Sequence, residues 1–282
     1  GIRNPAATEM ALRTASPDVV IHMAAQPLVR ESYLDPRRTF ETNVDGTLNV
    51  LEAVSRTDAV RALLVVTTDK VYRNTGRTDG YVETDALGGD DPYSASKAMA
   101  DLLVHSWTAS FPGPATAVAR AGNVIGGGDV SKDRLMPDLM RAFAQGRPAL
   151  VRNPLAVRPW QHVLDCLTGY LLLVDQLMAG SASGPWNFGP PPGSITTVED
   201  VCQRVAHIWG DAAEVSIDDS PQPHEAAILT LDSTKARQEL GWADRLPLDE
   251  CLQWTVQWEK AVTAGRPAAD ECLEQIRTYR HH

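Results

Sequence analysis

The chain has 282 residues, of which 43% are hydrophobic and 22% are charged, and this globular composition suits one large or two moderate domains. Its formal net charge of −10 argues against a nucleic-acid-binding protein, because phosphate recognition needs a basic face. No apolar run of about 18 residues and no basic-then-apolar leader occurs, so we expect neither a membrane protein nor an exported one.

The four cysteines are widely and unevenly spaced along the chain, at Cys166, Cys202, Cys251 and Cys272. They form no Cys-x-x-Cys pair and no Cys/His ligand pattern, which argues against a zinc site and against a disulfide framework. We therefore expect free thiols in a reducing cytoplasm and no metal site.

Strands and helices alternate in the first half of the chain. Short buried apolar runs predict strands at Asp18–His22, Ala62–Thr67 and Ala115–Arg120. Apolar residues at helical spacing predict helices at Pro36–Ser55 and Tyr93–Ser110. This alternation predicts an α/β fold with a Rossmann-type doubly wound parallel sheet, covered on both faces.

Beyond residue 124 the alternation breaks at a glycine triplet, Gly126–Gly128. Further helices are predicted at about 134–146, 163–179, 197–209 and 249–264. We expect the Rossmann domain to comprise residues 1–124 plus about 159–188. A smaller α/β domain would comprise about 125–158 and 189–282.

The phosphate-binding turn of a Rossmann domain is missing from this sequence. Such a domain opens with a strand and a Gly-x-x-Gly-x-x-Gly turn that leads into a helix. No such turn precedes Asp18, and Gly126–Gly128 lacks the strand-to-helix context. Loss of the first strand would expose an apolar strand edge. We therefore favour a chain that lacks a segment of the natural protein over a truncated form without its N-terminal half-site.

Tyr93 and Lys97 form the central chemical signal. Residues four apart on a helix share one face, about 6 Å apart along the axis. A lysine ammonium there can lower the pKa of the phenol and make Tyr93 a base near neutral pH. Taken alone, this spacing more often marks a tyrosine that packs in a core.

A second polar segment, Thr67–Lys70, follows the strand that begins at Ala62. Ligands of open α/β sheets bind beyond the carboxyl ends of the strands, so Thr68 could hydrogen-bond a reacting oxygen beside Tyr93. The alternative is a loop cap followed by a solvated charge pair. The downstream Tyr93 and Lys97 favour the first interpretation.

Two small residues, Ala24 and Ala25, follow the first predicted strand and would let another group approach the backbone. His22 lies on that strand, and we interpret it as a buried histidine with a partner rather than a catalyst. Among arginines in loops of the presumed substrate side (Arg120, Arg134, Arg152 and Arg158), Arg158 is framed by proline and tryptophan and suits a diphosphate best.

Together these motifs resemble the extended short-chain dehydrogenase/reductase superfamily, and more closely the CDP-glucose 4,6-dehydratases. The matching stretches are His22–Arg30, Thr67–Tyr72, Leu87–Lys97, Arg120–Asp129, Arg158–Val163 and Trp186–Gly189. They span roughly residues 18–190, and Leu231–Trp242 is weakly similar. Tyr-x-x-x-Lys identifies only the superfamily, whereas Thr-x-Asp-Lys, the glycine triplet and Arg-Pro-Trp-Gln-His are more specific.

The resemblance implies an NAD-dependent enzyme that oxidises C4 of a nucleotide-diphosphate hexose, removes water across C5 and C6, and returns the hydride to C6. CDP-glucose is favoured by the resemblance alone. Tyr93 would be the base for the 4-hydroxyl, Lys97 would bind the cofactor ribose, and Thr68 would bind the sugar. Asp69 would protonate the leaving 6-hydroxyl, and Lys70 would serve the C5 proton transfer.

The resemblance also implies the binding residues. Those for NAD are Ala24, Ala25, Gln26, Asn43, Thr67, Tyr93 and Lys97. Those for the nucleotide sugar are Asn123, Arg134, Arg158, Trp160 and His162. The first domain would then bind NAD and the second the sugar nucleotide. Related enzymes pair two helices into a four-helix bundle, so we expect a homodimer through residues 36–55 and 93–110.

Val130 departs from the resemblance, because the family often has tryptophan there. Two alternatives stay open. A sugar-nucleotide 4-epimerase uses the same scaffold but needs no acid at Asp69. A catalytically silent binding homologue is favoured by the missing glycine turn and disfavoured by the complete set of Thr68, Tyr93 and Lys97.

Overall fold

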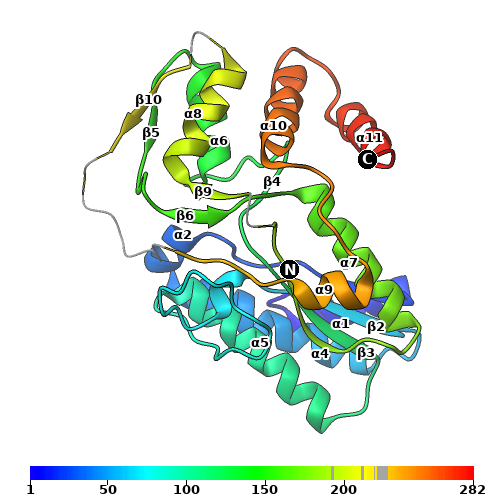
Figure 1. The fold of residues 1–282 in the computed structure, drawn as a ribbon. Coiled ribbons are helices and arrows are strands. Elements are labelled where there is room, and N and C mark those ends of the chain that lie inside the picture. The colour runs from blue at the N-terminus through cyan, green and yellow to red at the C-terminus, as the bar shows by residue number, and fades with distance from the viewer. Residues whose placement is uncertain (192–193, 211–212, 219, 221–227) are drawn as a thin grey trace. The chain divides into compact units, whose positions relative to one another are not determined.

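The computed structural model describes residues 1–191, 194–210, 213–218, 220 and 228–282 (Figure 1). The chain divides into two compact units. The first comprises Gly1–Ala121, Thr168–Phe188 and Leu231–Trp242, and the second comprises Gly122–Leu167, Gly189–Thr230 and Ala243–His282. Within the described residues, every helix is too short or too polar to cross a membrane.

The first unit is built on a four-stranded parallel sheet. Its strands are β1 (Val19–His22), β2 (Ala62–Val66), β3 (Ala115–Ala121) and β8 (Gly184–Phe188), in the order β1-β2-β3-β8. The three predicted strands and the predicted doubly wound α/β class are confirmed. β1 lies at one edge of this sheet, where Ile21 is exposed.

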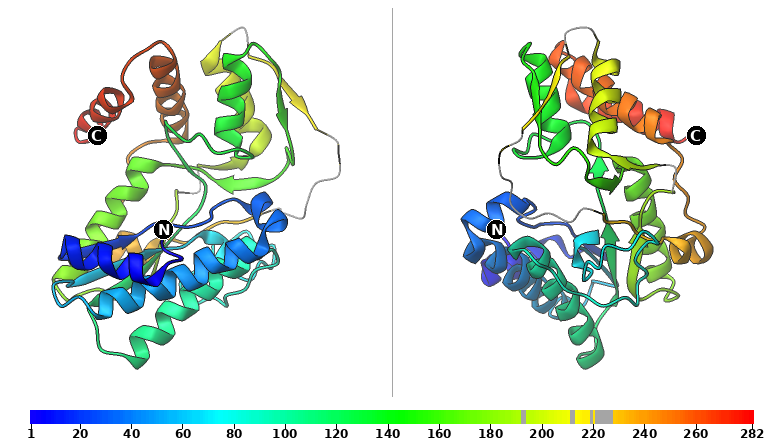
Figure 2. Two further views of the ribbon diagram at one scale, coloured as in Figure 1. Left: turned by 180° about the vertical axis from the view of Figure 1, so that it is seen from behind. Right: turned by 60° about the vertical axis from the view of Figure 1, so that its left-hand side comes forward.

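Helices cover both faces of the sheet, as Figures 1 and 2 show. On one face lie α1 (Pro5–Ala15), α4 (Gly46–Ser55) and α5 (Pro92–Ser110). Their apolar side chains form one core with residues of β2 and β3, including Val54, Val65, Val104 and Val118. On the other face lie the C-terminal part of α7 (Val163–Met178) and α9 (Thr234–Leu240).

The predicted helix at residues 36–55 is interrupted by a π-helical turn. It consists of α3 (Pro36–Phe40), the π turn Glu41–Asp45 and α4, and it follows the short α2 (Val29–Leu34). α5 confirms the second predicted helix and starts where its sequence dictates: the Asp91 carboxylate accepts a hydrogen bond from the Ser94 amide, and Pro92 occupies the first turn.

Among its described residues, the second unit contains small sheets, four complete helices and the first residues of α7. β4 (Val124–Ile125) pairs in parallel with β7 (Gln161–His162), β5 (Ala149–Val151) with β10 (Val215–Ile217), and β6 (Val157–Pro159) runs antiparallel to β9 (Ile195–Thr197). The helices are α6 (Leu135–Ala144), α8 (Val198–Trp209), α10 (Leu248–Thr263) and α11 (Ala268–Tyr279).

The core of this unit joins α6, α8 and α10, through side chains such as Leu139, Val201 and Leu252. The four helices predicted beyond residue 124 are confirmed to within a few residues, as α6, α7, α8 and α10. The helices α1, α2, α9 and α11 were not predicted.

Candidate functional site

The carboxyl ends of β1 and β2 leave the sheet side by side. His22 pairs with Val65 in the parallel register, so the residues that follow each strand emerge at the same edge. Met23–Gln26 follow β1, and Thr67–Lys70 follow β2. This edge is where open parallel sheets bind their ligands.

Tyr93 and Lys97 lie near the start of α5, and both are largely buried. The Tyr93 amide donates to the Ser32 Oγ of α2 at 3.1 Å. The Lys97 Nζ donates to the carbonyl oxygen of Val66, the last residue of β2, at 2.8 Å. Burial lowers the pKa of Lys97 to about 8, although the nearby Asp101 carboxylate opposes this shift. The lysine is therefore fixed at the carboxyl edge of the sheet.

The segment after β2 forms a 3₁₀ turn at Asp69–Val71, which packs against α5. The Thr68 Oγ1 donates to the Asp69 Oδ1 at 2.9 Å and accepts from the Lys70 amide at 3.4 Å. Thr68 and Asp69 are buried, and Lys70 is half-buried. Thr68 thus caps the 3₁₀ turn, as the alternative interpretation expected. Asp69 and Lys70, however, do not form the solvated surface pair of that interpretation.

Asn43, in the π turn, connects the loop after β1 to α5. Its amide exchanges two hydrogen bonds with the Gln26 backbone, at 2.8 and 3.0 Å, and donates to the Ser96 Oγ at 2.8 Å. Gln26 and Asn43 are buried, whereas Ala24 is exposed and Ala25 half-buried. The extra residue of a π turn is a recurrent feature of functional sites, and here it contributes to holding the loop after β1 in place.

His22 is a structural histidine of this site, as its position on the strand predicts. Its Nε2 lies 3.1 Å from the Thr47 Oγ1, which itself donates to the Asn43 carbonyl at 2.7 Å. Because the threonine hydroxyl has only one proton, the His22 Nε2 is the donor in this pair. Burial, assisted by the Lys97 charge, lowers the pKa of His22 to about 4, so the ring is neutral.

A buried polar network lies one helical turn beyond Lys97. The Asp101 carboxylate accepts two hydrogen bonds from Arg120, each of 2.8 Å, and a third from the Thr67 Oγ1 at 3.2 Å. Arg120 also donates to the Tyr72 Oη at 2.8 Å, and Tyr72 donates to Asn187 at 2.7 Å. The interpretation of Arg120 as a loop arginine of the substrate side was wrong: it lies on β3 and neutralises a buried carboxylate.

The five residues expected to bind the nucleotide sugar all lie in the second unit, whereas the expected cofactor and catalytic residues all lie in the first. Pairing of β4 with β7 brings Asn123 beside Gln161, whose amide donates to the Asn123 carbonyl at 3.3 Å. Arg134 pairs with Asp129 at 3.4 Å and is half-buried. Arg158, Trp160 and His162 are buried, and burial lowers the pKa of His162 to about 4.

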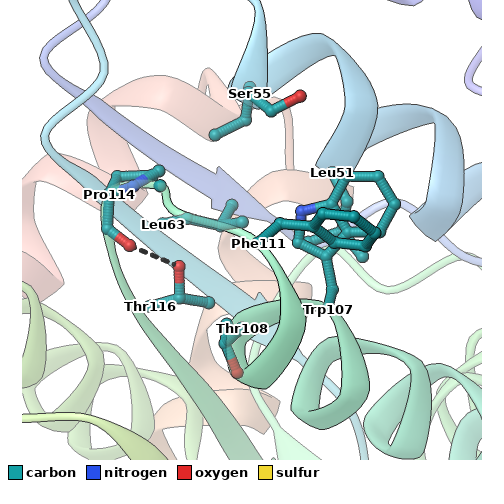
Figure 3. Close-up of a pocket in the computed structure, with 10 residues that line it drawn as sticks. Leu51, Ser55, Leu63, Trp107, Thr108, Phe111, Pro114 and Thr116 are labelled. Carbon is teal, nitrogen blue, oxygen red and sulfur yellow. Dashed lines mark hydrogen bonds between the residues drawn. The ribbon is translucent and has the colours of Figure 1, made fainter.

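An apolar pocket of the first unit lies away from these residues (Figure 3). Leu51, Leu63, Trp107 and Phe111 line it, and the Thr116 hydroxyl beside them donates to the Pro114 carbonyl at 2.9 Å. Leu63 and Thr116 lie near the amino ends of their strands, opposite the edge where Lys97 is held. This pocket is therefore not the candidate site. Among the described residues, no group of three or more His, Cys, Asp or Glu side chains could hold a metal ion.

A tyrosine and a lysine on one helix face, at the carboxyl edge of a doubly wound parallel sheet, define a nicotinamide-dependent enzyme of the extended short-chain dehydrogenase/reductase class. The model of the NAD dependent epimerase/dehydratase family matches residues 1–189, and the chain belongs to this family.

Relatives and solved structures agree with this assignment. The chain is 44% identical, over 88% of its own length and 72% of the relative's, to a CDP-glucose 4,6-dehydratase of Salmonella typhimurium. It is 31% identical to a dTDP-glucose 4,6-dehydratase of Streptomyces griseus, over 86% of the chain and 72% of the relative. Its structure resembles the UDP-glucose 4-epimerase of Thermus thermophilus in complex with NAD, with a TM-score of 0.82, 27% identity and coverage of 92% and 83%.

Proposed function

We propose that this protein is an NAD-dependent CDP-glucose 4,6-dehydratase, a hydro-lyase that converts CDP-glucose to CDP-4-keto-6-deoxyglucose. The observation that carries the proposal is the buried Thr68–Asp69 pair in a turn that packs against α5, the helix of Tyr93 and Lys97. A proton acceptor and a carboxyl group from adjacent elements are what an oxidation followed by an elimination requires. The 44% identity to a CDP-glucose 4,6-dehydratase supports the same substrate.

The residues of the first unit fit a nicotinamide cofactor. The Lys97 ammonium is held at the sheet edge by the Val66 carbonyl. In the loop after β1, Ala24 and Ala25 have small side chains, which leave room for a cofactor to approach the backbone. The residues that would hold NAD are Ala24, Ala25, Gln26, Asn43, Thr67, Tyr93 and Lys97. NAD bound there would supply the hydride acceptor for the oxidation at C4 and the hydride donor for the reduction at C6.

The first proton transfer belongs to Tyr93. Its phenolate takes the proton of the sugar 4-hydroxyl, and the Lys97 ammonium stabilises that phenolate electrostatically. The Thr68 hydroxyl donates a hydrogen bond to Asp69. Its oxygen can therefore act as the acceptor of a hydrogen bond from a sugar hydroxyl. Thr68 therefore orients the sugar for the transfer.

The elimination belongs to Asp69 and Lys70. A ketone at C4 acidifies the C5 proton, and Lys70 serves both its removal in the elimination and the return of a proton to C5 when hydride is added at C6. Asp69 protonates the 6-hydroxyl as it leaves as water. Asp69 is buried beside Thr68, so its carboxyl group is shielded from bulk water.

The second unit supplies the nucleotide-sugar site, through Asn123, Arg134, Arg158, Trp160 and His162. Arg134 is half-buried and suits diphosphate oxygens with its planar guanidinium group. Trp160 and His162 are buried, so they contribute by supporting the residues that contact the nucleotide sugar. Val130, in the position where the family often has tryptophan, is exposed.

A homodimer in the cytoplasm completes the proposal. Met99 and Leu102 are exposed on one face of α5, which supports pairing of this helix with its counterpart in a second copy. Cys166, Cys202, Cys251 and Cys272 are free thiols, which suits a reducing compartment.

A sugar-nucleotide 4-epimerase is the second candidate, because a UDP-glucose 4-epimerase structure superposes with a TM-score of 0.82. An epimerase expels no hydroxyl group and has no use for an acid at Asp69. A silent homologue is disfavoured by the intact set of Thr68, Tyr93 and Lys97. The test is an assay of the full-length protein with CDP-, dTDP- and UDP-glucose, measuring 4-keto-sugar formation. Release of a 4-keto-6-deoxy product from CDP-glucose supports the proposal, whereas a CDP-galactose product would establish the epimerase.

A further inference from the structure

We propose that Trp258 of α10 is a positioning residue for nucleotide-sugar binding, because it seats the glycine triplet that leads into the Asp129–Arg134 turn. This inference rests on the proposed function, which places Arg134 in the nucleotide-sugar site. It assigns a task to the C-terminal helix α10, for which the sequence motifs provide none.

The Trp258 indole packs directly on two consecutive glycines. A Cβ atom added to Gly127 would overlap the Cγ and Cδ2 atoms of the indole and lie 2.6 Å from its Cε3. A Cβ atom added to Gly128 would lie 3.2 Å from the Cη2 of the same ring, and Gly128 has a φ of +85°. Gly126 is also tightly packed, since a Cβ atom added to it would lie 2.6 Å from the Val163 Cγ1. The triplet is therefore required by close packing, and not by a phosphate-binding turn.

The nitrogen edge of the indole is held by α11. The Trp258 Nε1 donates to the Cys272 Sγ at 3.3 Å, and the side chain is only 7% exposed. One helical turn earlier, the Trp254 ring meets the His162 ring edge-on, with 5.7 Å between their centroids. Since His162 ends β7 and the triplet follows β4, α10 covers the ends of both paired strands.

The turn after the triplet is braced internally. The Asp129 carboxylate accepts from the Ser131 amide at 2.9 Å and pairs with Arg134 at 3.4 Å. Asp133 pairs with Arg152 at 2.8 Å. Because these contacts fix the turn within itself and to the residue that follows β5, its entry point is set by the glycines under Trp258. A tilt of the indole would displace Asp129 at the start of the turn, and with it the Arg134 guanidinium group that Asp129 pairs with.

The experiment compares CDP-glucose turnover by the full-length wild type with that of Trp258→Leu, Trp258→Phe, Gly127→Ala and Gly127→Ala combined with Trp258→Leu. Trp258→Leu and Gly127→Ala should each raise KM about tenfold, equivalent to about 1.4 kcal/mol of binding, with kcat nearly unchanged. Trp258→Phe should stay near the wild type. The double variant should be no worse than either single one, because a smaller side chain makes room for the added methyl group.

Trp209→Leu is the matched control. Trp209 packs on Phe143 in the same unit, with 5.8 Å between ring centroids, so its replacement should lower the melting temperature without raising KM. If wild-type protein turns over CDP-glucose but Trp258→Leu and Gly127→Ala keep its KM, or lose kcat in step with the melting temperature, the inference is wrong and the proposed function stands. If the wild type turns over no CDP-glucose, the proposed function falls and the inference falls with it. Should Trp258→Leu fail to fold, Gly127→Ala and Trp258→Phe decide.

Discussion

The Lys97 ammonium donates a hydrogen bond to the Val66 carbonyl at 2.8 Å, and thereby connects the two segments on which the proposed chemistry depends. Lys97 lies one helical turn after Tyr93 on α5, and Val66 is the residue from which the Thr67–Asp69 segment leaves β2. This single contact therefore fixes the Lys97 charge, which the proposal assigns to the base Tyr93, close to the turn that holds the proposed acid Asp69.

The charge of Lys97 should set the alkaline limit of activity. Burial lowers its pKa to about 8, so the ammonium is lost as the pH rises through 8, and with it the stabilisation of the Tyr93 phenolate. We expect kcat/KM to fall above about pH 8. Lys97→Arg should lose activity overall but also lose this limb, because a guanidinium group stays charged.

The titration of Lys97 does not itself destabilise the fold at alkaline pH. The pKa of Lys97 is lower in the fold than in the unfolded chain, so between pH 8 and about 10 the unfolded chain binds more protons and the contribution of this group to stability rises with pH. Circular dichroism measured alongside the rates should show a folded protein across the alkaline limb. A limb that coincides with loss of the folded signal would contradict the assignment.

Replacement of Tyr93 by Phe should abolish turnover and leave nucleotide-sugar binding nearly intact. The buried ring keeps its packing, and the amide of residue 93 keeps its hydrogen bond to Ser32, so only the proton acceptor is lost. The loss belongs in kcat, and calorimetric titration with CDP-glucose checks the binding. A Tyr93→Phe variant that retains about a tenth of the wild-type kcat would remove Tyr93 from the role of base.

The Asp101–Arg120 pair should contribute strongly to stability. Both side chains are at most 5% exposed, and Asp101→Ala leaves a buried guanidinium group without its carboxylate, at a cost of about 3–5 kcal/mol of unfolding free energy. Asp249→Ala is the control, because it breaks the exposed Arg204–Asp249 pair of 2.7 Å and should cost about 1 kcal/mol or less. Urea unfolding measures both, and equal losses would refute the distinction.

The sequence predicted three of the four strands of the sheet but not β8, and it predicted the helices α4 and α5 and the Tyr93–Lys97 face, because period and spacing are local properties. It also contained a signal for α1 that was missed: Asn4 followed by Pro5 is typical of a helix start, and the Asn4 side chain does accept from the Ala7 amide at 3.0 Å. Asp101, one turn beyond Lys97, could have been found by extending the same face.

The partners of these residues could not be predicted, because they depend on tertiary contacts. Ser32 accepts a hydrogen bond from the Tyr93 amide, and Asn43 donates one to the Ser96 hydroxyl. Arg120 donates to the Asp101 carboxylate. The spacing of these residues in the sequence indicates none of these pairs. Likewise, the glycine triplet was recognised as a motif, but the reason for its glycines lies in Trp258, more than a hundred residues away in the sequence.

The homodimer should depend on the exposed face of α5. Leu102→Arg places a charge at a position that is 53% exposed in the single chain, and we expect it to convert a dimer into a monomer. Light scattering at micromolar concentration measures the mass. Gln203→Arg, at an exposed polar position on α8, should leave the dimer intact. A wild-type protein with a monomeric mass would count against the proposed assembly.

Asp69 decides between the dehydratase and the epimerase. If its carboxyl group protonates the leaving 6-hydroxyl, Asp69→Asn should permit oxidation at C4 but stall the elimination, because an amide has no acidic proton to give. General acid catalysis contributes roughly 10²–10⁴-fold, so the loss of product formation should be severe. The fold should survive, since asparagine is nearly isosteric and its carbonyl oxygen can still accept the hydrogen bond from the Thr68 hydroxyl, 2.9 Å in the wild type.

The reduced form of the cofactor should then accumulate on the enzyme after mixing with CDP-glucose, and its near-ultraviolet absorbance can be followed by stopped flow in the full-length protein. Thr68→Val is the informative companion. In the proposed mechanism Thr68 orients the sugar for the first step, so this variant should slow the appearance of the reduced cofactor instead of trapping it. An Asp69→Asn variant that turns over at the wild-type rate, or slows without any accumulation, would show that Asp69 does not act in elimination. The epimerase would then be the better account of a site whose Tyr93 and Lys97 are shared by both reactions.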